Sequence, residues 1–426
     1  MIYRSLHLLL RFWLRIHFRR IFISNETEIP ANGPVLLACN HPNSFLDAVV
    51  IALLFKRPVN FLARSDVFKK PIAKWILTKL HLIPIYRLQE GVENIEKNKD
   101  TFRICSEILA KGEVLLIFSE GNCELEKRLR PLKKGSARIV FGAEELADWK
   151  LNIRIIPVGI NYTNPTQFRT ELLISFGVGF SSGSWKDSWL SDHSRTIINF
   201  NEQLKVELLQ NLLIIPKKEF DPEAEALLQL CRALFKYPLL KFIFKNDNRL
   251  KIEQKLLKSY FAKESTAQIN RYSAFNNSSA QAGLSLKAAI PKIHKYSTAL
   301  LLIGFIPAII GFILHALPLA ATILITKKSV KDPKFKSSVI FGIGAIITYL
   351  WYLFLGLLLF ALNGWLVLLL IIPPYLNLIC LIWWELIQQR RNRLQFIIFK
   401  RKSPKVFAHW KHERNELMMQ IHGSID

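Results

Sequence analysis

Residues 40–47, Asn-His-Pro-Asn-Ser-Phe-Leu-Asp, place one histidine and one aspartate within a single polar stretch. Asp47 can hydrogen-bond one imidazole nitrogen of His41 and leave the other nitrogen free to take a proton from a hydroxyl. The pair is therefore a candidate general base with its orienting carboxylate. The structural alternative is that His41 ends a strand and Asp47 caps the helix that follows.

The flanking residues must position this pair. The apolar run at 35–39 is typical of a buried strand, and the apolar residues 48–55 predict a packed helix. A polar turn between a buried strand and a helix is where α/β folds place their sites. We therefore expect residues 40–47 to form such a turn.

Three other stretches combine an apolar run with residues that could contact a substrate. Residues 81–87 predict a strand that ends in the cation Arg87, although a surface arginine is the simpler alternative. Residues 114–121 predict a second strand that ends in Ser119-Glu120-Gly121. A basic run follows, which is either a phosphate site or a solvated loop: Arg128, Arg130, Lys133 and Lys134. Residues 155–160, with Pro157 inside, predict a buried strand.

In this order, the four stretches resemble the motifs of the glycerolipid acyltransferase family, over residues 25–185. The family has four residues between its histidine and aspartate, whereas five separate His41 from Asp47, so we expect the turn to bulge by one residue. Ser119 stands where the family has proline. Cys123 stands where many members have arginine, so Arg128 or Arg130 is expected to supply that charge.

The resemblance implies a role for each motif. His41 would be the general base and Asp47 the residue that orients it. The acceptor phosphate would be held by cations: Arg87, Arg128 or Arg130, and Lys134. The acceptor pocket would be lined by Glu120, Gly121 and Asn43, and Pro157 would lie near the acyl site. The resemblance implies no metal and no cofactor.

The implied reaction moves a fatty acyl group from acyl-CoA or acyl-ACP to the hydroxyl of glycerol 3-phosphate or 1-acylglycerol 3-phosphate. The sequence does not choose between these acceptors, dihydroxyacetone phosphate and lyso amino-acid lipids. The region contains no G-x-S-x-G elbow, so direct attack by the acceptor hydroxyl is expected rather than an acyl-enzyme at Cys39. The rival from another class is a non-catalytic lipid-binding scaffold or transporter, in which His41 and Arg87 would lie far apart.

The composition favours a membrane protein. The 426 residues are half apolar and carry a net charge of +25, a combination that is unusual in soluble enzymes. A basic protein can bind nucleic acid or an anionic membrane, and the long apolar runs near the C-terminus favour the membrane. We expect no nucleic-acid partner. The five cysteines are scattered without metal-ligand spacing and predict buried thiols.

We predict an α/β catalytic domain with a largely parallel sheet over residues 23–215, because strand and helix patterns alternate there. Strands are expected at 34–39, 58–63, 82–86, 113–118, 153–160 and 171–177. Helices are expected at 45–56, 66–80, 93–110 and 134–147. Residues 1–22 predict a basic amphipathic helix in the membrane interface or, alternatively, a helix packed on the core. Residues 216–295 predict a helical extension of unknown role.

Residues 296–386 predict transmembrane or re-entrant helices, and 387–426 a basic cytoplasmic tail. The apolar runs cover 297–325, 338–362 and 365–384. Basic clusters before the first run, after it and after the third all favour the cytoplasmic side. The first run would then enter and return, with a bend between Pro307 and Pro318. A single span with the lysine loop outside is the alternative. Either way we expect a multi-pass membrane protein with its catalytic domain on the cytoplasmic face.

Overall fold

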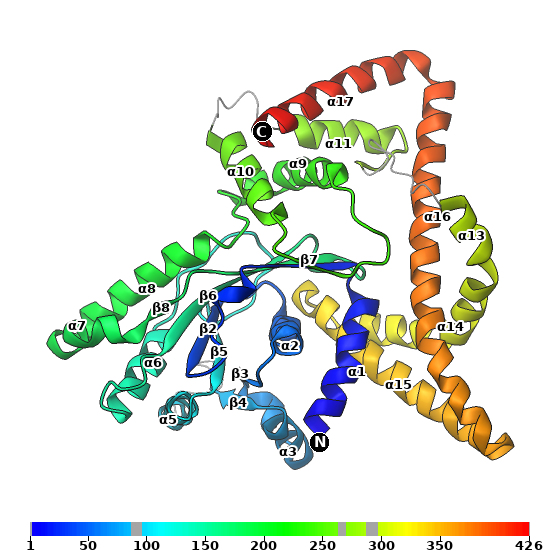
Figure 1. The fold of residues 1–426 in the computed structure, drawn as a ribbon. Coiled ribbons are helices and arrows are strands. Elements are labelled where there is room, and N and C mark those ends of the chain that lie inside the picture. The colour runs from blue at the N-terminus through cyan, green and yellow to red at the C-terminus, as the bar shows by residue number, and fades with distance from the viewer. Residues whose placement is uncertain (1, 87–95, 263–269, 287–296, 426) are drawn as a thin grey trace. The chain divides into compact units, whose positions relative to one another are not determined.

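The computed structural model describes residues 2–86, 96–262, 270–286 and 297–425, which form two compact units (Figure 1). Unit 1 comprises Met1–Leu212, Phe242–Asp247 and Asp332–Phe341. Unit 2 comprises Leu213–Lys241, Asn248–Lys331 and Gly342–Asp426. The strands of the described residues all lie in unit 1.

Unit 1 is built on a single nine-stranded sheet in the order β4-β3-β5-β2-β6-β7-β1-β9, with β8 paired to β6. The strands are β1 Arg20–Ser24, β2 Val35–Cys39, β3 Val59–Arg64, β4 Leu82–Ile85, β5 Val114–Phe118, β6 Arg154–Tyr162, β7 Glu171–Phe176, β8 Phe180–Ser181 and β9 Ile243–Lys245. Every pairing is parallel except those of β6 with β7 and β8. The predicted α/β class with a largely parallel sheet is confirmed.

The register of the sheet brings the polar turns together. Cys39 at the end of β2 lies opposite Phe118 at the end of β5, and Arg64 at the end of β3 lies opposite Ile85 of β4. Because β2, β5, β3 and β4 are mutually parallel, their carboxyl ends share one edge. The residues that follow β2, β3 and β5 therefore meet at that edge.

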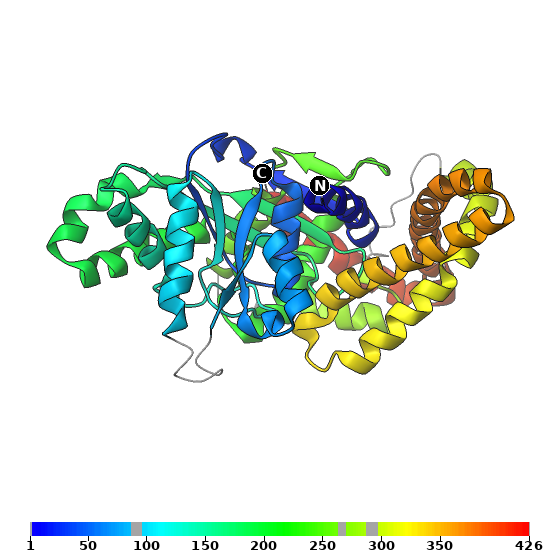
Figure 2. The same cartoon turned by 90° about the horizontal axis from the view of Figure 1, so that it is seen from below.

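Helices cover both faces of the sheet (Figures 1 and 2). On one face α5 (Lys97–Ala110), α6 (Gly135–Leu146) and α8 (His193–Leu209) pack together, and α7 (Lys186–Ser191) precedes α8. On the other face α1 (Ile2–His17) packs on α2 (Ser44–Leu54). The short α3 (Pro71–Lys79) follows the 3₁₀ turn η2 (Ser65–Phe68) and contacts β4 at the edge. The apolar faces of these helices and the strands form one core.

The helix predicted for residues 1–22 is shorter in the structure and is followed by a strand. The helix α1 ends at His17, and Arg20–Ser24 forms β1, because the β-branched and aromatic run Ile21-Phe22-Ile23 pairs in parallel with β7. The second half of α1 buries Trp13, Leu14 and Ile16, as the packed-helix alternative requires. The sequence also failed to predict β9, which has three residues and lies far along the chain.

The described part of 216–295 is helical as predicted except at β9, which belongs to the sheet of unit 1, and its helices pack with the C-terminal residues of unit 2. The helices that pack together are α9 (Asp221–Leu234), α10 (Arg249–Ala262), α11 (Arg271–Gln281) and α17 (Pro404–Ile425). Trp410 of α17 donates to the Ser279 hydroxyl at 2.9 Å. The buried Glu253 binds Arg249 and Arg232, each at 2.7 Å, so its charge is balanced.

The apolar region forms α13 (Ser297–Ile303), α14 (Phe305–Ser329), α15 (Lys336–Leu362), the 3₁₀ segment η7 (Gly364–Ile371) and α16 (Ile372–Lys402). Within the part of the chain that the structure describes, three segments are apolar and long enough to cross a membrane: 305–329, 333–362 and 364–402. The boundary expected near residue 386 therefore lies inside α16. Near Gly311, α14 lies against the Leu376 backbone of α16.

The middle of α14 lies beside α15. The His315 ring is 2.7 Å from the Tyr352 hydroxyl, and Trp351 donates to the Leu314 carbonyl oxygen at 2.9 Å. The helix α14 therefore contacts α16 near Gly311 and α15 near His315. The helix continues through Pro318.

Candidate functional site

The carboxylate of Asp47 is fully buried and accepts hydrogen bonds from three groups. His41 Nδ1 and the Asn43 backbone N–H donate to Oδ2, at 2.9 and 2.7 Å. The Tyr162 hydroxyl donates to Oδ1 at 2.7 Å. Burial and the charge of Asp47 raise the pKa of Tyr162 well above its ordinary value, so the phenol keeps its proton and remains a donor. The predicted pair of His41 and Asp47 is thus in direct contact.

The turn between them bulges, as its five intervening residues require. Ser44, at the start of α2, takes a φ of +37°, a left-handed conformation that side chains rarely adopt. Asn43 is completely buried, and its side-chain amide donates to the Pro165 carbonyl oxygen at 2.9 Å. The bulge lets the Asp47 carboxylate reach back to the His41 ring.

Two contacts fix the orientation of the His41 ring, one with Phe118 and one with Asp47. The ring stacks on Phe118 with 3.8 Å between ring centroids and 9° between planes. Since Nδ1 faces Asp47, Nε2 is the nitrogen left for the cavity that His41 lines. This tautomer is a proton acceptor at Nε2.

Glu120 holds the turn after β5 against the His41 backbone. Its Oε1 accepts from the His41 backbone N–H at 2.9 Å, and its Oε2 accepts from Arg130 Nε at 2.9 Å. Next to it, Gly121 has a φ of +78°, and an added Cβ would lie 3.2 Å from Lys133 Cγ. Glycine therefore allows both the turn and the close approach of Lys133.

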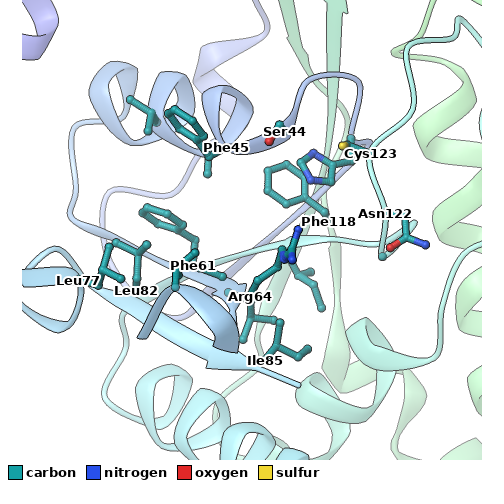
Figure 3. A pocket seen from close by; sticks show the side chains of 18 of the residues that line it. Ser44, Phe45, Phe61, Arg64, Leu77, Leu82, Ile85, Phe118, Asn122 and Cys123 are labelled. Atoms are coloured by element: carbon teal, nitrogen blue, oxygen red, sulfur yellow. The ribbon is translucent and has the colours of Figure 1, made fainter. Parts of the chain in front are cut away.

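A cavity of about 1430 Å³ opens beside His41 (Figure 3). One part is apolar and includes Phe45 of α2, Phe61 of β3 and Leu77 of α3. The other part carries charge. The described cations on its wall are Arg64, Lys133, Lys134, Arg138 and Lys334, and the acids are Asp66, Glu124 and Asp332. The cavity therefore presents both charged and apolar side chains, with an excess of cations and with His41 on its wall.

Of the predicted site residues, His41, Gly121 and Lys134 line this cavity. Asp47, Asn43 and Glu120 are buried behind its wall. Pro157 is buried in β6 beside Ala38 of β2. Arg130 binds Glu120, and Arg128 binds Glu126 at 3.0 Å. Arg87 lies outside the described residues, so its distance from His41 is not defined.

Sequence reasoning did not select several residues that the fold brings to this site. Arg64 ends β3 and extends toward Phe118 in Figure 3. Arg64 follows an apolar strand pattern in the sequence, which is the same signal that selected Arg87, so this pattern could have identified it. Tyr162 and Lys334 lie 115 and 210 residues from their partners Asp47 and Glu124, so no local pattern links them.

The thiols near the site are poor nucleophiles. Burial, with a smaller effect of Asp47, raises the pKa of Cys39 well above its ordinary value. Burial also raises the pKa of Cys123, which lines the cavity. Because the thiolate is the reactive form, neither cysteine is activated. Among the residues described, no group of three or more His, Cys, Asp or Glu could hold a metal ion.

Residues 20–161 match the family model described as Acyltransferase. A chloroplastic 1-acyl-sn-glycerol-3-phosphate acyltransferase of Arabidopsis thaliana is 25% identical over 156 residues, which are 36% of this chain and 40% of the relative. A 1-acyl-sn-glycerol-3-phosphate acyltransferase of Bacillus subtilis is 26% identical over 121 residues, covering 28% of this chain and 54% of the relative. The chain thus spans less than two thirds of the length of these relatives.

Glycerol-3-phosphate O-acyltransferase 1 of Saccharomyces cerevisiae is 35% identical over 71 residues, which are 17% of this chain and 9% of that protein. The crystal structure of the 1-acyl-sn-glycerophosphate acyltransferase of Thermotoga maritima aligns with a TM-score of 0.34 and 16% identity. This alignment covers 47% of this chain and 78% of that one.

Chemical labelling tests the state of the two thiols. We expect iodoacetamide at pH 7 to leave Cys39 unmodified in the folded protein, because the thiol is buried and protonated, and to modify it after unfolding. Cys123 should react slowly. Peptide mass spectrometry gives the extent at each site. Modification of native Cys39 as fast as in the unfolded chain would contradict this assignment.

Proposed function

We propose that this chain, whose residues 20–161 match the Acyltransferase family model, transfers a fatty acyl group in phospholipid biosynthesis. The donor is acyl-CoA or acyl-ACP, and the acceptor is glycerol 3-phosphate or 1-acylglycerol 3-phosphate. The observation that carries the proposal is the contact of His41 with Asp47 beside a cavity whose wall has both cationic and apolar side chains.

In the proposed mechanism His41 Nε2 takes the proton of the acceptor hydroxyl while that oxygen attacks the thioester carbonyl carbon. Asp47 holds the ring with its proton on Nδ1 and stabilises the imidazolium that forms. The tetrahedral intermediate then collapses to the ester. The C–S bond breaks, and the leaving thiolate takes the proton from His41. No acyl-enzyme is formed, in keeping with the protonated thiols of Cys39 and Cys123.

The cations of the cavity suit a phosphate. Arg64, Lys134 and Arg138 lie on the wall that also carries His41, and charged hydrogen bonds to phosphate hold an acceptor in register. Arg87 remains a candidate for the same task. Arg128 and Arg130 are proposed to act on the loop, since each binds a glutamate of that loop.

Glu120 and Asn43 are proposed to support the acceptor pocket from behind, because both are buried and bind the turns beside His41. The apolar side chains of the cavity, such as Phe45 and Leu77, are proposed to receive the acyl chain. Pro157 is proposed to support the acyl site through the core, as its strand pairs with β2.

A lyso amino-acid lipid remains the alternative acceptor, but its ammonium group would compete with Arg64 for Asp66 and with Lys334 for Glu124. A non-catalytic scaffold or transporter is disfavoured, since it has no need for a buried carboxylate that orients a histidine toward a cavity.

We further propose that the catalytic domain lies on the cytoplasmic face of the membrane. The lysines from the last turn of α14 to the start of α15 favour that side: Lys327, Lys328, Lys331, Lys334 and Lys336. The basic residues before the first apolar run and after the third favour the same side. The proposed topology has α13 and α14 entering and returning, and α15 and α16 crossing outward and back.

The surface around α3 supports this orientation. Ile72, Trp75 and Ile76 are exposed, and lysines at 69, 70, 74 and 79 surround them. Apolar side chains ringed by cations suit the interface of an anionic leaflet, where each cation contributes about 1 kcal/mol. Since Leu77 of the same helix lines the cavity, an acyl chain could pass between the leaflet and the site.

The direct test of function is an acyl-transfer assay of the purified protein, with both thioester donors and a panel of phosphorylated acceptors. We expect ester formation with a glycerol-phosphate acceptor. His41→Ala should lower kcat by about 10²–10⁴-fold or more, because the base is lost. Asp47→Asn should be damaging but less so, since the imidazole remains. A folded His41→Ala protein with near-normal kcat would contradict the mechanism.

The phosphate assignment predicts a selective change in binding. Arg64→Ala should raise the acceptor KM by about tenfold and leave the donor KM unchanged, because one charged hydrogen bond is lost at a partly exposed side chain. The matched control is Arg103→Ala, which removes an exposed arginine of α5 that pairs with Glu107. A larger effect of Arg64→Ala on the donor KM would move Arg64 out of the acceptor site.

The topology predicts labelling from one side only. In intact cells an impermeant thiol reagent should label Asn363→Cys, at the turn between α15 and η7, relative to the parent chain. Lys328→Cys should stay unlabelled until the cells are opened, because it lies in the last turn of α14, at the end that the topology places on the cytoplasmic side. Strong labelling of Lys328→Cys from outside would rule out the re-entrant arrangement.

A further inference from the structure

The segment Asp332–Phe341 comprises the end of the turn after α14 and the first six residues of α15, and it belongs to the same compact unit as residues 20–161. It lies outside the matched residues 20–161 by more than 170 positions along the chain. Two of its serines, Ser337 and Ser338, are fully buried. A buried hydroxyl is stable only when it is hydrogen-bonded, so their partners show what the segment holds.

Ser338 binds the bulge of the His41–Asp47 turn. Its hydroxyl accepts from the Leu46 backbone N–H at 3.2 Å. The same hydroxyl donates between the backbone oxygen and the side-chain oxygen of Asn43, each at 3.2 Å. Because the Asn43 N–H donates to Asp47 Oδ2, a hydrogen-bonded path runs from Ser338 through Asn43 and Asp47 to His41.

The Ser338 contacts meet a specific need of this turn. Ser44 lies between Asn43 and Leu46 with a φ of +37°. Such a conformation costs of the order of 1–3 kcal/mol and persists only where the surroundings hold it. Ser338 binds the residues on both sides of Ser44, so it fixes the bulge that lets Asp47 reach the ring.

Lys334 binds the other side of the site. Its ammonium lies 2.8 Å from Glu124 Oε1, and the Glu124 backbone N–H donates to the His41 carbonyl oxygen at 3.1 Å. Ser338 therefore binds the turn of residues 43–47, and Lys334 binds Glu124. Both of these stretches hydrogen-bond His41. Lys334 and Asp332 also line the cavity.

The segment is itself anchored in unit 1. The Trp13 indole of α1 donates to the Phe341 carbonyl oxygen at 2.9 Å, and His17 Nε2 lies 3.1 Å from the Ser337 hydroxyl. Ser337 is thus as buried as its neighbour but contacts α1 rather than the catalytic turn.

We propose that Ser338 of this segment completes the active site as the positioning residue for the His41–Asp47 pair. This inference rests on the proposed function of His41 as the base. A misplacement of about 1 Å at reacting groups can lower a rate by about 10²-fold. Loss of the Ser338 hydroxyl therefore lowers kcat and leaves the substrate contacts of the cavity in place.

The test compares Ser338→Ala with Ser337→Ala in the full-length protein, each variant losing one buried hydroxyl. We expect Ser338→Ala to lower kcat at least about tenfold with the KM of both substrates within twofold. Ser337→Ala should keep kcat within about twofold. Ser338→Thr, which retains the hydroxyl, should recover activity if it folds. A Ser338→Ala protein with normal kcat, or equal losses in both alanine variants, would overturn the proposal.

A second measurement does not depend on activity. Hydrogen–deuterium exchange of the peptide that contains residues 41–47 reports on the Leu46 N–H that Ser338 accepts. We expect faster exchange there in Ser338→Ala and unchanged exchange in Ser337→Ala. Unchanged exchange in Ser338→Ala would contradict the positioning role of Ser338, whether or not the wild type transfers an acyl group. Conversely, an inactive wild type with the expected exchange would refute the proposed function while leaving the contact between the segment and the turn established.

Discussion

The buried carboxylate of Asp47 is the interaction on which the rest of the site depends. A buried charge must be paired or hydrogen-bonded, and here the three donors come from the turn, from His41 and from the far end of β6. These donors fix the position of the imidazole and select which nitrogen faces the cavity. The strained φ of Ser44 and the contacts of Ser338 serve the same arrangement, because both bring Asp47 within reach of the ring.

The sheet explains why the other groups converge on this pair. Parallel strands present their carboxyl ends at one edge, so the residues after β2, β3 and β5 meet there although they are far apart in sequence. The wall of the cavity combines the cations Arg64, Lys133, Lys134, Arg138 and Lys334 with apolar side chains of α2, α3 and β3. Such a wall suits a substrate pair that brings both a phosphate and an acyl chain to His41, as the proposed function requires.

Much of this could be predicted from the sequence because the signals are local. The alternation of apolar runs and helix patterns gave the α/β class, and His41 and Asp47 lie within seven residues of each other. The missing parts are long-range. Tyr162 and Ser338 reach the turn from distant positions, and β1 and β9 are short strands whose pairing depends on β7 and on each other. A hydrophobic pattern shows that a residue is buried but not what it contacts.

The central claim is that His41 carries its proton on Nδ1 and presents a bare Nε2 to the acceptor. Its most direct test is ¹⁵N NMR of the detergent-solubilised protein with labelled histidine imidazoles, with His41 assigned by difference from a His41→Gln variant. For neutral His41 the account predicts a protonated Nδ1 and an unprotonated Nε2, with the Nε2 resonance perturbed when the acceptor binds. A proton on Nε2, or rapid averaging between the two tautomers, would contradict it.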